Sequence, residues 1–242
     1  MKVITNDKLI TRNGNIGKYL TIGALFVLFA GMAVTWLRPD LFWLSWIGLL
    51  FGIVFWQIGL FFSNRWGRSP RPDEIITRSL KGLNYDFTLY HYNTPVSHLL
   101  VGPAGIWVIL PYYQRGTITY EKNRWKQRGG GLGLAYMKIF AQEGLGRPDL
   151  DAQDDVAKMT NYLSKVNIAD IPEINPVLVF IDKRAQLQVE GAPIPAFMAS
   201  DVKDFLKKRA KEAPYPKEWI ESIKAVLPQE EKSGKKTEEE QE

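Results

Sequence analysis

Two long apolar runs dominate the first quarter of the chain. Residues 19–37 and 41–64 contain no charged side chain, over nineteen and twenty-four positions respectively. Because a helix needs about 20 apolar residues to cross the hydrocarbon core of a bilayer, each run is long enough to span a membrane. Only residues 38–40 separate the runs, and the proline among them, Pro39, ends a helix and turns the chain. The pattern predicts a transmembrane helical hairpin over residues 19–64.

Basic residues are distributed unevenly around this hairpin. The N-terminal segment 1–18 carries four of them and the linker 65–72 carries three, whereas the turn has Arg38 alone, beside Asp40. Since short loops rich in lysine and arginine stay in the cytoplasm, this predicts a multi-pass protein of the cell membrane with both termini and the soluble domain cytoplasmic. A cleaved signal peptide with a small-x-small site at 31–33 is the alternative, but a second span follows almost at once.

The second apolar run contains Gly48 and Gly52, with Gly59 further along the same face. Glycines at this spacing allow two helix backbones to approach closely, as in GxxxG dimers. Two interpretations follow. The glycine face receives the first helix of the same hairpin, or it joins two copies of the chain in a homo-oligomer through Gly48 and Gly52.

After the linker 65–72, the spacing of apolar residues predicts a folded domain over residues 73–228. Strands are expected near residues 87–89, 97–101, 105–110, 117–120, 176–181 and 186–189. Amphipathic helices are expected from Asp73 onward and at residues 149–165, 202–209 and 218–226. This order of strands and helices predicts an α/β domain with a mixed sheet.

Composition narrows the chemistry. The chain has no cysteine, so disulfides, cysteine nucleophiles and thiolate metal sites are excluded. The net charge of +5 is compatible with an anionic partner but does not require one. The charged tail 229–242 has no apolar residue and is predicted to be disordered. The glycine-rich segment 129–133 lacks the GK[ST] ending of a phosphate-binding P-loop, so a mobile surface loop is expected.

A stretch in the middle of the chain carries a family resemblance. Residues 97–109 read Ser-His-Leu-Leu-Val-Gly-Pro-Ala-Gly-Ile-Trp-Val-Ile, followed by Gly-Thr-Ile at 116–118. This resembles the signature of the nuclease-related domain (NERD) family, which is grouped with the restriction-endonuclease-like PD-(D/E)xK fold. Weaker matches are Glu74, Gln153 and residues 176–181. The resemblance implies a restriction-endonuclease-like fold for the soluble domain.

The same resemblance places three unsuitable residues at the family's catalytic positions. Ser97 stands at the position of the aspartate, Leu110 at that of the glutamate and Tyr112 at that of the lysine. Such nucleases need carboxylates to hold Mg²⁺ and a lysine to stabilise developing charge. We therefore expect a pseudoenzyme with no catalytic residues, no metal and no cofactor. A rearranged metal site is the alternative, with acids contributed by the neighbouring helix: Asp151, Asp154 or Asp155.

Basic residues also recur at every second position after residue 120. Lys122, Arg124, Lys126 and Arg128 project from one face if a single strand continues through them, with Trp125 on the other face. Such a ribbon can bind nucleic-acid phosphates or lipid headgroups. The alternative is a solvated hairpin whose edge strand carries charges that only prevent aggregation.

The two histidines of the chain, His91 and His98, have no neighbouring acid in the sequence. His98 is therefore expected to be structural, and His91 receives no role.

These observations predict a membrane-anchored, catalytically inactive NERD-like domain that binds nucleic acid or a protein partner. An active metal-dependent nuclease with a rearranged site predicts three or more acids clustered near Ser97. A structural membrane-assembly protein predicts an exposed apolar patch in place of the basic one.

Overall fold

The computed structural model describes residues 1–129, 144–166 and 173–229. Most of the glycine-rich segment and nearly all of the C-terminal tail lie outside these ranges. The chain forms two compact units, one made of Met1–Thr5 with Lys81–Glu242 and one made of Asn6–Leu80. The N-terminal segment 1–18 is therefore divided, because its first five residues belong to the unit that contains the soluble domain.

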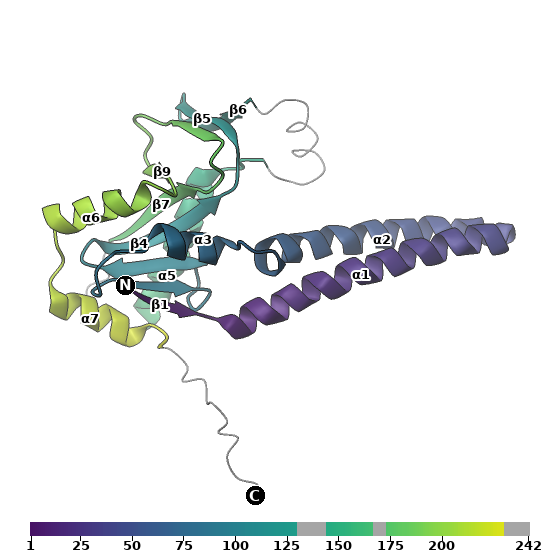
Figure 1. The fold of residues 1–242 in the computed structure, drawn as a ribbon, viewed down its shortest axis with the longest axis horizontal. Coiled ribbons are helices and arrows are strands. Elements are labelled where there is room, and N and C mark those ends of the chain that lie inside the picture. Colours follow the sequence, from purple (N-terminus) through teal and green to yellow (C-terminus); the bar gives the residue numbers. More distant parts are fainter. Residues whose placement is uncertain (130–143, 167–172, 230–242) are drawn as a thin grey trace, which may run out of the picture. The chain divides into compact units, whose positions relative to one another are not determined.

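The unit Asn6–Leu80 is helical. Helix α1 spans Asp7–Leu37, η1 spans Pro39–Leu41 and α2 spans Phe42–Phe62 (Figure 1). A single π-helical turn, η2 (Ser63–Gly67), and the short helix α3 (Pro72–Ser79) follow. The predicted hairpin is present, but α1 begins twelve residues before its apolar run. Asn6 starts the helix, since its side-chain oxygen accepts a hydrogen bond from the backbone N–H of Leu9 at 3.0 Å.

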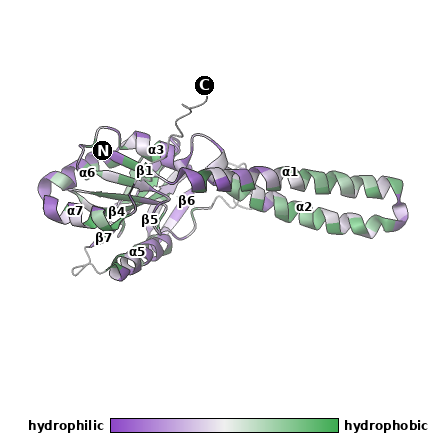
Figure 2. Cartoon of the chain, turned by 90° about the horizontal axis from the view of Figure 1, so that it is seen from below, coloured by the Kyte–Doolittle hydropathy of each residue, from purple (hydrophilic) through white to green (hydrophobic). Residues whose placement is uncertain are grey.

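The apolar surface of the hairpin is not buried within the protein. Apolar positions cover most of α1 and α2 (Figure 2). Only 6% of the most apolar window of α1 is buried, and 11% of the corresponding window that contains α2. Phe26 is 72% exposed and Leu50 is 64% exposed. A helix in the core of a soluble protein would bury these side chains. Both helices are also long and apolar enough to cross a membrane.

Glycines determine how closely the two long helices pack. A Cβ atom on Gly52 would lie 2.7 Å from the side chain of Leu28, and one on Gly59 would lie 2.9 Å from the backbone nitrogen of Thr21. The glycine face of α2 therefore receives α1 of the same hairpin, which confirms the first of the two interpretations. A homo-oligomer through Gly48 and Gly52 would require α1 to move away from this face.

The second unit is built on a six-stranded sheet of order β1-β2-β3-β4-β7-β9 (Figure 1). Its strands are β1 (Lys2–Thr5), β2 (Thr88–His91), β3 (His98–Gly102), β4 (Gly105–Tyr112), β7 (Ile174–Phe180) and β9 (Ala196–Met198). The pairs β2–β3 and β3–β4 are antiparallel, whereas β1–β2, β4–β7 and β7–β9 are parallel. The sheet is thus mixed, and the predicted α/β class is confirmed.

The predicted hairpin between β3 and β4 is present, and steric constraints explain why two of its positions are glycine. Gly102 pairs with Gly105 across the turn. Gly105 has a φ of +97°, which side chains rarely adopt. A side chain on Gly102 would collide with the ring of Phe87. These two glycines explain much of the Gly-Pro-Ala-Gly pattern without any catalytic requirement.

Helices cover both faces of the large sheet. Residues on one face join a hydrophobic cluster with α5 (Pro148–Lys165) and α7 (Lys217–Val226), through Met159, Leu163 and Ile223. On the other face, Trp107 of β4 packs edge-to-face against Phe205 of α6 (Val202–Glu212) at 5.2 Å between ring centroids. Alternate side chains of β4 therefore pack against helices on opposite faces of the sheet.

A smaller three-stranded sheet has the order β6-β5-β8, with β5 (Gly116–Glu121), β6 (Arg124–Arg128) and β8 (Ala185–Gln188). β5 and β6 are antiparallel and Glu121 pairs with Arg124, so Lys122 and Asn123 form a two-residue turn. Both turn residues have positive φ, 52° and 57°. One continuous basic strand is therefore excluded, because the chain reverses at Lys122, and β6 is the edge strand of a hairpin, as in the alternative interpretation.

Candidate functional site

The three residues that the NERD resemblance aligns with catalytic positions lie at one end of the β3–β4 pair. Leu110 and Tyr112 are two residues apart on β4 and share one face of the strand, and both are buried. Ser97 directly precedes β3, and its backbone carbonyl accepts a hydrogen bond from the N–H of Tyr92 at 2.9 Å. Leu99 pairs with Val108, and the same register continued by two residues places Ser97 opposite Leu110. Tertiary structure thus brings the three positions together.

Tyr112 occupies the lysine position with a different set of contacts. Its hydroxyl donates a hydrogen bond to Asp151 Oδ2 of α5 at 2.9 Å, and its ring stacks on Phe180 at 5.5 Å. Burial, followed by the nearby negative charge of Asp151, raises the pKa of the Tyr112 phenol well above its usual range. This side chain remains a neutral hydrogen-bond donor at any physiological pH.

The acids of α5 are engaged in ion pairs or with Tyr112. Asp154 and Asp155 lie 2.6 Å and 3.0 Å from the Lys158 ammonium group. Hydrogen bonds to these two carboxylates raise the pKa of Lys158. Within the described residues, no three His, Asp or Glu side chains converge on a point where they could hold a metal ion. The rearranged nuclease site predicted such a cluster near Ser97.

A buried histidine pair lies next to this end of the sheet. His91 and His98 are register partners on β2 and β3, and their Nδ1 atoms are 2.8 Å apart. Each ring is 1% exposed. The pairing was not predicted, because the two residues are seven positions apart and only the strand register places them opposite each other. One Nδ1 donates and the other accepts, so the two rings hold different tautomers.

The basic residues after position 120 form a charged hairpin of β5 and β6. Lys126 Nζ and Arg128 Nη2 both contact Glu121 Oε2 at 3.1 Å. These interactions, led by the hydrogen bond from Lys126, lower the pKa of Glu121. Glu121 was not predicted to belong to this surface, and it offsets part of the positive charge.

The remaining cations of this hairpin are at its tip. Lys122 lies in the turn, and Arg124 is the first residue of β6. Neither makes an ion pair within the described part of the chain. On the opposite face, Trp125 is buried and packs against Tyr120 at 5.4 Å between ring centroids. The hairpin therefore presents a basic tip and edge on a sheet anchored by aromatic side chains.

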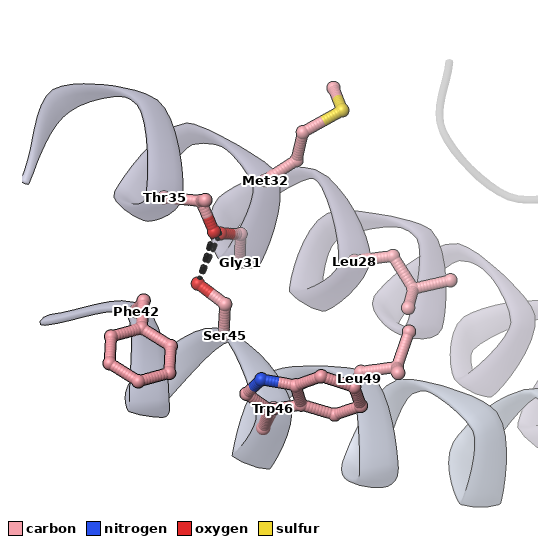
Figure 3. Close-up of a pocket in the computed structure, with 8 residues that line it drawn as sticks. All are labelled: Leu28, Gly31, Met32, Thr35, Phe42, Ser45, Trp46 and Leu49. Atoms are coloured by element: carbon pink, nitrogen blue, oxygen red, sulfur yellow. Dashed lines mark hydrogen bonds between the residues drawn. The ribbon is translucent and has the colours of Figure 1, made fainter. Parts of the chain in front are cut away.

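A polar link joins α1 and α2 near their turn (Figure 3). Thr35 Oγ1 donates to Ser45 Oγ at 2.6 Å, and Ser45 Oγ donates to the carbonyl oxygen of Gly31 at 2.7 Å. Its three residues also line an open groove of about 350 Å³, together with Met32 and Trp46. The groove has no titratable side chain, so it offers packing surface and no chemistry.

Comparison of the chain with known protein families, with characterised proteins and with solved structures finds no match. These comparisons identify neither the NERD family nor a restriction-endonuclease-like fold, so the resemblance depends on the motif residues alone.

Proposed function

We propose that this chain is a membrane-anchored, catalytically inactive NERD-like module that binds nucleic acid through its β5–β6 hairpin. The observation that carries the binding role is the arrangement of Lys122 and Arg124 at the tip of that hairpin, with Lys126 and Arg128 along β6. A two-stranded ribbon with cations on one face fits the phosphate backbone of nucleic acid, and such a ribbon can enter a major groove.

The exposed apolar helices support membrane anchoring, and strand β1 supports the topology. β1 pairs in parallel with β2, so residues 2–5 lie in the same sheet as residues 88–91. Helices α1 and α2 lie between these two strands in the sequence. Because a helical hairpin that spans a membrane crosses it twice, both strands must then be on the same side. Together with the cation distribution, this supports a cytoplasmic position for both ends.

The side chains at the motif positions support a binding role rather than cleavage. Leu110 cannot ligate a metal, and the Tyr112 hydroxyl is committed to Asp151 at 2.9 Å. A restriction-endonuclease-like fold is part of the same proposal, supported by the mixed sheet and by the closeness of Ser97, Leu110 and Tyr112.

The exposed surface of the soluble unit argues against a purely structural assembly role. Its large hydrophobic side chains that are exposed in the described ranges are Tyr85, Tyr113 and Leu150. Tyr85 and Tyr113 lie in loops and Leu150 lies in α5, so no single helix or strand in the described part of this unit presents a row of exposed apolar side chains for assembly.

The test is nucleic-acid binding by the full chain in nanodiscs of zwitterionic lipid. A fragment that starts at Ser69 is unsuitable, because it lacks β1 and leaves β2 as an open edge. We expect fluorescence anisotropy to show binding that weakens steeply with salt. Changing both Lys122 and Arg124 to Gln should reduce the slope of log K against log salt by about 2, one per lost phosphate contact.

The matched control changes Lys207 and Arg209 of α6 to Gln, which removes the same two charge types from another exposed site. Equal losses in both variants would indicate non-specific attraction and contradict the assigned surface. No binding at low salt would remove nucleic acid as the partner and favour a protein partner. Cleavage with Mg²⁺ or Mn²⁺ would contradict the inactive assignment.

A further inference from the structure

A groove with polar and basic walls lies at the end of the helical hairpin opposite its turn. It has a volume of about 550 Å³, within the range of about 300–1,000 Å³ usual for ligand sites. One wall is a stripe of α1 with the spacing i, i+4, i+7 and i+11: Thr11, Asn15, Lys18 and Ile22. The other wall is η2 and the residues after it: Ser63, Trp66, Gly67, Arg68 and Arg71.

Glycines bring the two walls together. A Cβ on Gly17 would lie 2.7 Å from the backbone nitrogen of Ser63, and one on Gly14 would lie 3.3 Å from the carbonyl oxygen of Trp66. The backbones of α1 and η2 therefore touch at this level. The cations Lys18 and Arg68 follow directly after Gly17 and Gly67, at the edge of this contact.

The charges of the groove are unbalanced. No aspartate or glutamate lines it. Arg71 is held by Asp73 and Glu74, each at 3.0 Å. Lys18 and Arg68 make no ion pair with any carboxylate of the described chain. Two cations therefore face the groove without a negative partner, in the company of hydroxyl and amide donors from Thr11, Asn15 and Ser63.

The position of the groove along the hairpin matches the headgroup layer of a membrane. α2 has 21 residues and is about 31 Å long, which equals the thickness of the hydrocarbon core. Its end therefore places η2 at the headgroup layer. α1 has 31 residues and is about 46 Å long, so its first turns extend beyond the core, and Lys18 is the last charge before its apolar run. Trp66 has the amphipathic ring that prefers this layer.

We propose that this groove binds the phosphate group of an anionic membrane lipid through Lys18 and Arg68. The proposal depends on the membrane anchoring proposed above and is independent of nucleic-acid binding. The lipid phosphate accepts hydrogen bonds from the ammonium and guanidinium groups, and the acyl chains lie along the apolar surface beyond Ile22. Inorganic phosphate shares the charge but lacks the chains, so it binds much more weakly.

The first experiment asks whether the full chain resists extraction from membranes by alkaline carbonate. Release would overturn both the anchor and the lipid site. For a retained chain, native mass spectrometry from detergent micelles with added phosphatidylglycerol measures bound lipid. We expect the Lys18→Gln, Arg68→Gln variant to lose affinity about 30-fold, the loss expected for two cations at an anionic surface.

The matched control is the Arg12→Gln, Arg65→Gln variant. It removes one charge from α1 and one from η2, the turn directly before Arg68, at positions that do not line the groove. This variant should retain the lipid, and so should the charge-conserving Lys18→Arg, Arg68→Lys variant. Equal losses in the two Gln variants would overturn the groove as a specific site. Full competition by millimolar inorganic phosphate would show a free-anion site and overturn the assignment to lipid.

Discussion

The imidazole rings of His91 and His98 meet Nδ1 to Nδ1 at 2.8 Å, across the antiparallel pair β2–β3. Their centroids are 4.9 Å apart and the rings are nearly perpendicular, at 79°. A hydrogen bond between two Nδ1 atoms needs one proton there. If both rings carried both protons, two N–H groups would face each other and the bond would be lost. The pair can therefore accept at most one of the two protons that the unfolded chain accepts.

This proton count predicts acid sensitivity. Because the unfolded state binds more protons below the ordinary histidine pKa of about 6.5, the free energy of unfolding should fall as the pH decreases through that value. These are the only histidines in the chain, so the His91→Gln, His98→Gln variant should flatten the pH dependence between about 7.5 and 5. Denaturant titrations at several pH values measure the effect. An unchanged slope in the variant would assign the dependence to carboxylates instead.

The buried phenol of Tyr112 predicts that the free energy of unfolding falls at alkaline pH. Its pKa is raised above the ordinary value of about 10, first by burial and then by Asp151. The neutral phenol is favoured in the fold, so its stabilisation is present below pH 10 and is lost as the pH rises above 10. At pH 7, Tyr112→Phe should reduce the free energy of unfolding by about 0.5–1.5 kcal/mol. Tyr85→Phe, at a 93% exposed side chain, should have no effect.

The burial of strand β1 predicts that the soluble unit needs residues 2–5 for its stability. Ile4 is 2% exposed in the core cluster, whereas Val3 on the alternate face of the strand is only partly buried. Ile4→Ala should reduce stability by about 2–5 kcal/mol, the range for a fully buried side chain. Val3→Ala should cost clearly less. Denaturation of the full chain in detergent compares the two, and equal costs would show that the pairing with β2 does not bury this strand.

Gly17 predicts how closely α1 and η2 pack. The missing Cβ would lie 2.7 Å from the backbone nitrogen of Ser63, where no side chain can move aside. Gly17→Ala should therefore destabilise the hairpin by about 1–3 kcal/mol, as overpacking does. At Gly23, a Cβ would meet nothing within 4 Å, so Gly23→Ala in the same helix should be neutral or stabilising. Thermal unfolding in detergent separates the two outcomes.

The β5–β6 turn predicts a stabilising substitution. Lys122 and Asn123 both have positive φ, and a two-residue turn of this kind favours Asn followed by Gly. Asn123→Gly should leave the stability unchanged or raise it by up to about 1 kcal/mol, and nucleic-acid affinity should not change. Lys122→Asn should retain the turn while it weakens binding. A loss of stability in Asn123→Gly would contradict the turn geometry.

Several features of this protein follow from sequence alone. The apolar runs are long and uncharged, so length and composition were sufficient to predict both long apolar helices and the turn at Pro39. Local signals also predicted α5 and the β3–β4 hairpin. Strands β1 and β9 were missed because they have four and three residues, and such short segments are strands only because a neighbouring strand supplies hydrogen bonds.

Tertiary structure alone decided which residues meet. The periodic pattern from Lys122 to Arg128 was compatible with one strand or with a hairpin, because a turn with two positive φ angles leaves the alternation of charges intact. The pairing of His91 with His98, the bond from Tyr112 to Asp151 and the groove beside Lys18 each join residues from different elements. Their closeness depends on strand register and helix packing, which arise from contacts that are distant in the sequence.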